Sequence, residues 1–385
     1  MSEIAPRPRA SSTRTPAGLT SKPRRSPRAA ATPAADKQRP AAAAQSEPLP
    51  RERAEHLARA LAPWFLAHQR DLEWRHTRDP YAIWVSEVML QQTRVDTVKS
   101  YWAPFMRRFP DLATLAAADE QQVLAAWSGL GYYRRARLLH AGAQHVHTQL
   151  GGRLPAAPEQ LREIPGIGRY TAGAITSIAH DQPAALVDGN VARVLSRLQA
   201  IREPKQQGAD AAGHWTLAQQ IVEAGSPRVL AQALMELGAT VCTPQQPRCD
   251  ACPVRPHCHA HARGLVDQIP APKLRAASPQ QDLWAVGLRK AGRLLLTRRP
   301  DAGLLAGMWC LPLLERPPAP PEAPHDPIKH VFTHRVWMLW PLRADLDLAD
   351  NAGTPTGECA WIGPGERPVG GIPTVTERLL ERLGY

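Results

Sequence analysis

The chain has 385 residues, enough for two or three domains, and it carries a formal net charge of +12. No apolar run approaches the roughly 20 residues that span a bilayer. The N-terminus also lacks a compact apolar stretch followed by a small-residue cleavage site, so the sequence favours a cytoplasmic protein over a secreted or membrane-spanning one.

Residues 1–50 form a basic segment with nine Lys or Arg against three Asp or Glu, and they contain no aromatic residue. A segment so rich in Pro, Ala, Ser and Arg cannot bury enough apolar surface to fold, which predicts a disordered basic tail. The prolines argue against the amphipathic helix of a transit peptide. Such a tail would be attracted to a polyanion without sequence preference.

Residues 51–268 show helical periodicity. Leu57, Leu61 and Phe65 recur at helical spacing, and glycine-containing breaks follow at 129–131 and 151–152. The pattern predicts an all-α domain.

Within this domain, the run from Tyr81 to Thr93 places Glu87 among apolar neighbours, including Trp84 and Val88. A glutamate on a helix is usually solvated, but apolar residues on several faces predict partial burial here. Burial would raise the carboxyl pKa and keep the group protonated near neutrality.

A glycine turn interrupts the next helical pair, at Gly166 and Gly168, and Asp188 stands before a further helical run at 191–198. A glycine turn at a helix N-terminus suits a phosphate oxygen, although the same pattern occurs in ordinary helix–helix turns. Asp188 is predicted to be a helix N-cap and therefore an anion. An anion of this kind could stabilise a cationic transition state at a sugar.

Four cysteines follow with gaps of six, two and five residues: Cys242, Cys249, Cys252 and Cys258. Four thiolates at such short spacing can hold a metal centre, and the spacing is unlike paired Cys-x-x-Cys zinc knuckles. The other two cysteines, Cys310 and Cys359, stand alone, and a disulfide framework is disfavoured in a reducing cytoplasm.

Residues 269–281 contain three prolines and predict a linker. Beyond it, 283–288 and 293–297 flank Lys290-Ala291-Gly292 as a predicted hairpin, 331–342 is a further predicted strand, and 374–383 is a predicted helix. Residues 282–385 are therefore expected to form a second domain, of α+β type.

The segments 84–95 and 129–137, together with the glycine turn, the aspartate and the cysteine loop, resemble the MutY family of adenine DNA glycosylases. The resemblance covers residues 51–385 and implies a mainly α fold. The implied fold comprises a helix-hairpin-helix DNA glycosylase domain with a [4Fe-4S] cluster on the four cysteines and a Nudix-like domain that recognises 8-oxoguanine. The resemblance further implies a monomer that acts on double-stranded DNA containing adenine opposite 8-oxoguanine or guanine.

Carried over to this chain, the resemblance assigns Glu87 as the acid that protonates adenine and Asp188 as the carboxylate facing C1′ of the sugar. The other implied site residues fall into four groups: Tyr170 and Asn190 around the aspartate; Arg75, Leu90, Thr93 and Glu236 at the adenine or its strand; Gln92 and Tyr132 in the base stack; Phe332, Thr333 and His334 at 8-oxoguanine. Thr333 departs from the family's serine by one methyl group.

Strand-cleaving relatives carry a Schiff-base lysine after the hairpin, but no lysine lies between Lys99 and Lys205, which implies a monofunctional glycosylase. The sequence after Leu314 lacks the acidic metal-binding helix of a Nudix hydrolase. Two alternatives remain open: an endonuclease III-like pyrimidine glycosylase and lyase, and a non-catalytic DNA-binding protein with a structural zinc.

Overall fold

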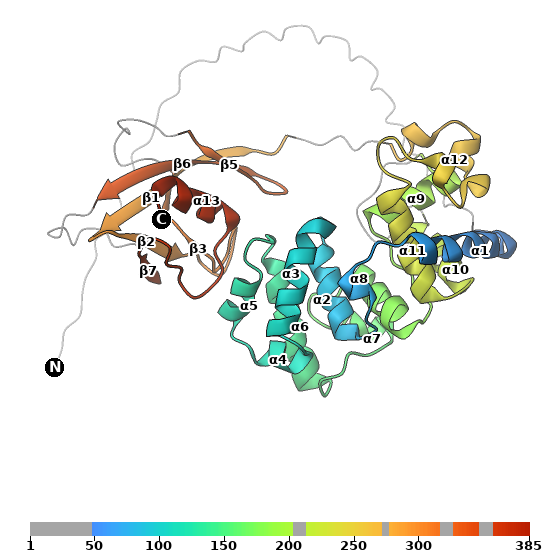
Figure 1. Ribbon diagram of the computed structural model, residues 1–385, viewed down its shortest axis with the longest axis horizontal. Helices are drawn as coiled ribbons and strands as arrows, with labels where there is room; N and C mark the ends of the chain where they lie inside the picture. The colour runs from blue at the N-terminus through green and yellow to red at the C-terminus, as the bar shows by residue number, and fades with distance from the viewer. Residues whose placement is uncertain (1–47, 203–212, 272–276, 316–325, 346–356) are drawn as a thin grey trace, which may run out of the picture. The chain divides into compact units, whose positions relative to one another are not determined.

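The computed structural model describes residues 48–202, 213–271, 277–315, 326–345 and 357–385 (Figure 1). The predicted tail lies almost entirely outside these ranges. Up to residue 271 the regular structure is helical throughout the described residues. Its elements are α1 (Arg51–His68), η1 (Glu73–Arg75), α2 (Pro80–Leu90), α3 (Val95–Arg108), α4 (Leu112–Ala117), α5 (Glu120–Ala126), α6 (Arg134–Gln149), α7 (Pro158–Leu161), α8 (Arg169–Ala174), the π-helical η2 (Ile175–Ala179), α9 (Gly189–Gln199), α10 (His214–Glu223), α11 (Pro227–Thr240), η3 (Cys249–Ala251), η4 (Arg255–His257), α12 (His259–Ala262) and η5 (Val266–Gln268).

Side-chain caps fix where the helices that carry the site begin. Asp79 accepts hydrogen bonds from the backbone N–H groups of Tyr81 and Ala82, and Pro80 occupies the first position of α2. Ser226 and Pro227 start α11 in the same way. The predicted N-cap of α9 is confirmed, because the Asp188 side chain accepts from the N–H groups of Asn190 and Val191.

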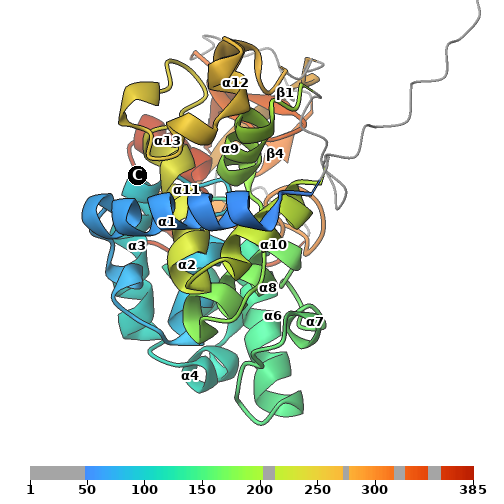
Figure 2. The same ribbon diagram turned by 90° about the vertical axis from the view of Figure 1, so that its right-hand side faces the viewer.

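The helices pack around two apolar clusters. One contains Trp84, Phe105 and Trp127, and the other contains Leu57 and Phe65 from α1. Helices α1, α10 and α11 lie side by side around the second cluster (Figure 2). Since α2 contributes Trp84 to the first cluster and Ile83 to the second, it lies between the two and is held on both faces.

The C-terminal part is a seven-stranded mixed sheet with one helix. Its elements are β1 (Gln280–Lys290), β2 (Arg293–Arg298), β3 (Trp309–Cys310), β4 (Leu313–Leu314), β5 (Ile328–Val331), β6 (Val336–Asp345), β7 (Cys359–Ile362) and α13 (Thr374–Leu383). The main strand order is β3-β2-β1-β6-β5, with β1 and β6 parallel and the other pairs antiparallel. Leu379, Leu380 and Leu383 of α13 cover the apolar core of this sheet.

The predicted hairpin is confirmed in its turn. Lys290 pairs with Arg293, and the intervening Ala291 and Gly292 have φ of 49° and 75°. Two consecutive positive φ angles are typical of the tight turn whose twist matches antiparallel strands.

The strand predicted at 331–342 matches β6 from Val336 onward but is wrong at residues 332–335. The chain turns at 332–335, where the Phe332 N–H donates to the Arg335 carbonyl at 2.8 Å, and β5 and β6 pair as a second hairpin. The polar residues Thr333, His334 and Arg335 interrupt the apolar residues at this turn, and the single-strand prediction did not take this signal into account. The predicted helix at 374–383 matches α13.

The predicted fold class is confirmed: a helical part is followed by a mixed α+β part. The domain boundaries at residues 51, 269 and 282 stay predictions, although β1 begins at Gln280, two residues before the predicted start of the second domain. No helix among the described residues is long and apolar enough to cross a membrane.

Candidate active site and cysteine loop

A cleft of about 760 Å³ in the helical part brings most of the predicted site residues together. Residues from α2, the loop after it, the glycine turn, α9 and α11 line this cleft. The predicted residues among them are Arg75, Glu87, Leu90, Gln92, Thr93, Gly166, Gly168, Tyr170, Asp188, Asn190 and Glu236. Segments up to about 160 residues apart in sequence thus converge on one cavity.

Glu87 lies in the last turns of α2 and is only 4% exposed. The Tyr170 hydroxyl donates a hydrogen bond to its Oε2 at 2.7 Å. Burial raises the pKa of Glu87 to about 7; the Tyr170 hydrogen bond lowers it, the Asp188 charge raises it, and the Arg75 charge lowers it. The direction of the shift agrees with the predicted protonated carboxyl, since a pKa of about 7 leaves a substantial protonated fraction at neutral pH.

Asp188 differs from Glu87 in its hydrogen bonding. Its Oδ1 accepts from the backbone N–H groups of Asn190 and Val191 at 2.8 and 2.7 Å, and its Oδ2 accepts from the Asn190 side chain at 3.0 Å. Three donors and the N-terminus of α9 stabilise the charged form of this carboxylate. Arg193 extends the arrangement by donating to Asn190 Oδ1 at 2.9 Å and to the Cys242 carbonyl at 2.8 Å.

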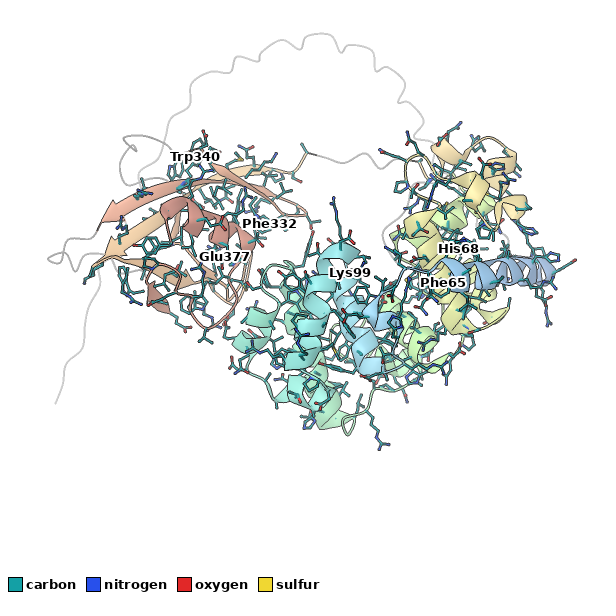
Figure 3. The ribbon with its side chains drawn as sticks, viewed as in Figure 1. Phe65, His68, Lys99, Phe332, Trp340 and Glu377 are labelled. Atoms are coloured by element: carbon teal, nitrogen blue, oxygen red, sulfur yellow. The ribbon has the colours of Figure 1, made fainter. Side chains whose placement is uncertain are left out.

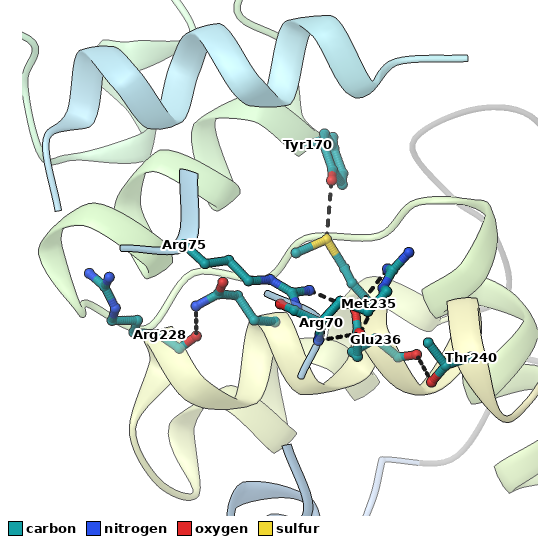
Figure 4. A network of polar contacts seen from close by, with 8 residues as sticks. Arg70, Arg75, Tyr170, Arg228, Met235, Glu236 and Thr240 are labelled. Carbon is teal, nitrogen blue, oxygen red and sulfur yellow. Dashed lines mark hydrogen bonds and ion pairs between the residues drawn. The ribbon is translucent and has the colours of Figure 1, made fainter. Parts of the chain in front are cut away.

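Glu236 is fully buried in α11 and is paired with two arginines (Figure 4). Arg70 donates to both carboxylate oxygens at 2.8 Å, and Arg75 donates to Oε2 at 2.7 Å. Burial alone would raise the pKa of Glu236, but the hydrogen bonds from Arg70 and Arg75 outweigh it and lower the pKa to about 2. The Arg75 guanidinium also lies 5.3 Å from the ring centre of Phe65, which Figure 3 labels in α1.

The glycine turn matches its prediction in one position and departs from it in the other. Gly166 has φ of 83°, and a Cβ at this position would lie 2.8 Å from the Cβ of Leu138, so only glycine fits. Gly168 has φ of −89° and precedes α8 as its N-cap residue, so its backbone conformation does not require glycine.

The predicted DNA-contacting residues that do not line the cleft are Tyr132, Phe332, Thr333 and His334. Gln92, which lines the cleft, and Tyr132 have positive φ of 57° and 48°, and Tyr132 is 47% exposed. The Tyr132 hydroxyl lies 3.3 Å from the Thr333 hydroxyl, so the structure brings two of the predicted DNA-contacting residues together. Phe332, Thr333 and His334 form the turn of the β5–β6 hairpin (Figure 3 labels Phe332), where His330 and Trp337 stack edge-on against the Phe332 ring.

The cysteines Cys242, Cys249, Cys252 and Cys258 carry free thiols and line a common pocket. In the part of the chain that the structure describes, no three His, Cys, Asp or Glu side chains are arranged to hold a metal ion. Thiolates are ligands both of zinc sites and of iron–sulfur clusters.

Two arginines, of which Arg197 is buried and Arg53 is partly exposed, hold this cysteine loop. Arg197 is 2% exposed and donates to Cys242 Sγ at 3.3 Å and to the Thr243 carbonyl at 2.7 Å. Arg53 donates to the His257 carbonyl at 2.9 Å. Four thiols beside a buried guanidinium suit an anionic iron–sulfur cluster, so the residues present fit that group.

Sequence reasoning missed Arg70, Met235 and Arg135. Met235 Sδ lies 3.3 Å from the Tyr170 hydroxyl oxygen, whose proton is donated to Glu87. Arg70 stands five residues before Arg75, but no local pattern pairs it with Glu236. Nothing in the sequence singled out Arg135, which lies in an arginine-rich run.

Residues 85–215 match the family model of the HhH-GPD superfamily base excision DNA repair protein, and residues 283–382 match the NUDIX domain model. The adenine DNA glycosylase of Buchnera aphidicola subsp. Baizongia pistaciae (strain Bp) is 32% identical over 245 residues, which are 63% of this chain and 69% of that protein. This chain belongs to the adenine DNA glycosylase family.

The chain spans about three fifths of the length of some relatives that it matches. The Rattus norvegicus adenine DNA glycosylase is 41% identical over 313 residues, which are 68% of this chain and 61% of the relative. Among solved structures, a thermostable thymine-DNA glycosylase superposes with a TM-score of 0.50 and 26% identity, over 55% of this chain and 98% of that one. The family and the helix-hairpin-helix glycosylase fold are thus shown.

Proposed function

We propose that this protein is a monofunctional DNA glycosylase that removes adenine mispaired with 8-oxoguanine or guanine. The observation that carries the proposal is a pair of carboxyl groups with different environments in one cleft. Glu87 is buried and has a pKa raised to about 7, whereas Asp188 accepts three hydrogen bonds at a helix N-terminus. Two such groups can act as an acid and as an electrostatic stabiliser of a cation.

In this mechanism adenine flips out of the duplex into the cleft, which costs a few kcal/mol. Arg75 and Glu236 line the base, and protonated Glu87 donates its proton to N7 so that adenine leaves as a neutral base. The Asp188 carboxylate stabilises the developing positive charge on the sugar, and attack by water at C1′ leaves an abasic site.

A [4Fe-4S] cluster bound by the four cysteines would cross-link the loop from Cys242 to Cys258 and hold it against α9. No lysine lies between Lys99 and Lys205, which supports hydrolysis rather than a Schiff-base lyase step. We further propose a cytoplasmic monomer, with Phe332, Thr333 and His334 as the residues that recognise 8-oxoguanine.

The test is incubation of the full chain with four duplexes that carry adenine opposite 8-oxoguanine, guanine, cytosine or thymine. Alkali after the reaction cleaves abasic sites and reports excision, and omission of alkali reports lyase activity. Excision from the first two duplexes, with strand breaks only after alkali, is the expected result. Excision of a pyrimidine, or a complex trapped by borohydride, would instead favour the endonuclease III-like alternative.

A further inference from the structure

A buried guanidinium that the proposed chemistry does not use lies beside the cleft. Arg135 is in the first turn of α6 and is 9% exposed, and burial lowers its pKa to about 10, so it stays charged at neutral pH. A buried charge is costly unless it is hydrogen-bonded, and since Arg135 Nε has no partner, Nη1 and Nη2 make its hydrogen bonds. Its partners therefore indicate what it does.

One set of partners lies at the end of α2 and in the loop that follows. Arg135 Nη1 donates to the carbonyls of Val88, Met89 and Gln91 at 2.7, 2.8 and 2.6 Å. Arg135 Nη2 donates to Thr93 Oγ1 at 3.0 Å. The last carbonyls of a helix have no partner within the helix, so these bonds cap α2 and fix the residues on either side of Gln92.

A second set of partners lies in the loop before α6. Arg135 Nη2 also donates to the Leu130 and Gly131 carbonyls at 3.4 and 3.3 Å. The guanidinium carbon lies 5.4 Å from the ring centre of Tyr132 and 5.5 Å from that of Trp127. The loop that presents Tyr132 is thereby held by the same side chain.

Both loops present a non-glycine residue in the left-handed region, Gln92 and Tyr132. A residue in this conformation is strained and keeps it only when its surroundings enforce it. The flat guanidinium reaches the carbonyls next to both residues at once. A lysine ammonium has three donors at one point and cannot span the two loops.

We propose that Arg135 is a positioning residue that joins the loops at 91–93 and 130–132, so that Gln92 and Tyr132 enter the DNA as one unit with a fixed separation. This inference rests on the proposed function, because it takes Gln92 and Tyr132 as the residues that replace the flipped base. It gives Arg135 a role in base flipping and none in bond cleavage.

The first experiment needs no DNA. Amide hydrogen exchange of the free protein should become faster in both loops, 91–93 and 130–132, in Arg135→Met and Arg135→Lys. Arg134→Met is the matched control, since it removes an exposed charge from the same turn. Faster exchange in only one loop, or none, would overturn the coupling whether or not the protein excises adenine.

The second experiment is a mutant cycle on single-turnover excision from the adenine:8-oxoguanine duplex. Arg135→Met should slow excision about tenfold or more in the wild-type background, and less than about twofold in a Gln92→Ala/Tyr132→Ala background, because residues that act as a unit are not additive. Arg135→Lys should show a similar loss, whereas Arg134→Met should stay within about twofold of wild type.

Fluorescence of 2-aminopurine in place of the target adenine separates flipping from chemistry. We expect the 2-aminopurine fluorescence increase that accompanies flipping to be absent with Arg135→Met. Arg135→Met could instead slow excision equally in the wild-type and Gln92→Ala/Tyr132→Ala backgrounds and leave the fluorescence increase normal. That result would show that Arg135 only supports the cleft, and it would overturn the proposal. If the wild-type chain excises no adenine, the proposed function fails, and the exchange experiment still decides the coupling.

Discussion

Tyr170 donates a 2.7 Å hydrogen bond to Glu87, although the two residues are 83 positions apart. Glu87 is held by α2 and Tyr170 by α8, the helix that follows the glycine turn. The bond therefore links the turn expected to bind phosphate to the carboxyl expected to protonate the base. The local electrostatics of this pair lead to the first two predictions.

Glu87→Gln should abolish excision and leave binding to the mispaired duplex within a few-fold of wild type. Glutamine keeps the shape of the side chain but cannot donate an acidic proton. The measurement is single-turnover excision together with a binding isotherm for the same duplex. Glu159→Gln, an exposed change of the same kind, is the control, and near-normal excision by Glu87→Gln would remove this residue from the mechanism.

The pH profile of excision should depend on Tyr170. Since the reactive form of Glu87 is protonated, the rate should fall as pH rises above about 7, the pKa of the folded protein. The Tyr170 hydrogen bond lowers this pKa, so Tyr170→Phe should raise it and shift the falling limb to higher pH. A limb that stays in place, or moves to lower pH, would contradict this account.

Glu236→Gln should destabilise the fold in a pH-dependent way. Breaking a buried ion pair by removing one partner costs about 3–5 kcal/mol. The pKa of Glu236 in the folded protein is about 2, below its ordinary value of 4.5, so its contribution is full above pH 4.5 and is lost as pH falls toward 2. Urea unfolding of wild type and variant at pH 7 and at pH 3.5 tests this prediction. The difference between their free energies of unfolding should be smaller at the lower pH.

Much of this site could be predicted from the sequence, because local signals mark it. Asp188 precedes a helical run, and Glu87 stands in an apolar helix, so an N-cap and a buried carboxyl followed from spacing alone. The partners of Glu236 could not be predicted in the same way, since they depend on how η1 packs against α11. Packing also brings Met308 and Cys310 into the first helical cluster, which no local pattern indicated.

Cys252→Ala should remove iron and lower the stability of the helical part, as its thiol is one of the four proposed cluster ligands. The visible absorbance of the purified protein, its iron content and its thermal unfolding measure the effect. Cys359→Ala, which changes a cysteine in β7 outside the loop, is the matched control. An iron-free Cys252→Ala protein with wild-type stability and activity would show that the loop does not need a cluster.

His334→Ala should reduce the preference for adenine opposite 8-oxoguanine over adenine opposite guanine. One lost hydrogen bond is worth about 0.5–1.5 kcal/mol, so we expect a change in the rate ratio of about twofold to tenfold. His147→Ala, an exposed change in α6, serves as the control at the same salt concentration. An unchanged ratio would remove His334 from recognition of the opposite base.

The register of the β5–β6 hairpin is fixed by residues outside its turn. Four residue pairs, from Ile328 with Leu339 to Val331 with Val336, fix the strands, and edge-on rings at His330 and Trp337 support Phe332 from both sides. Randomising residues 333–335 would therefore leave the ladder and the aromatic support unchanged. A selection on such a library could retune which damaged base is read opposite adenine while the residues proposed for bond cleavage stay unchanged.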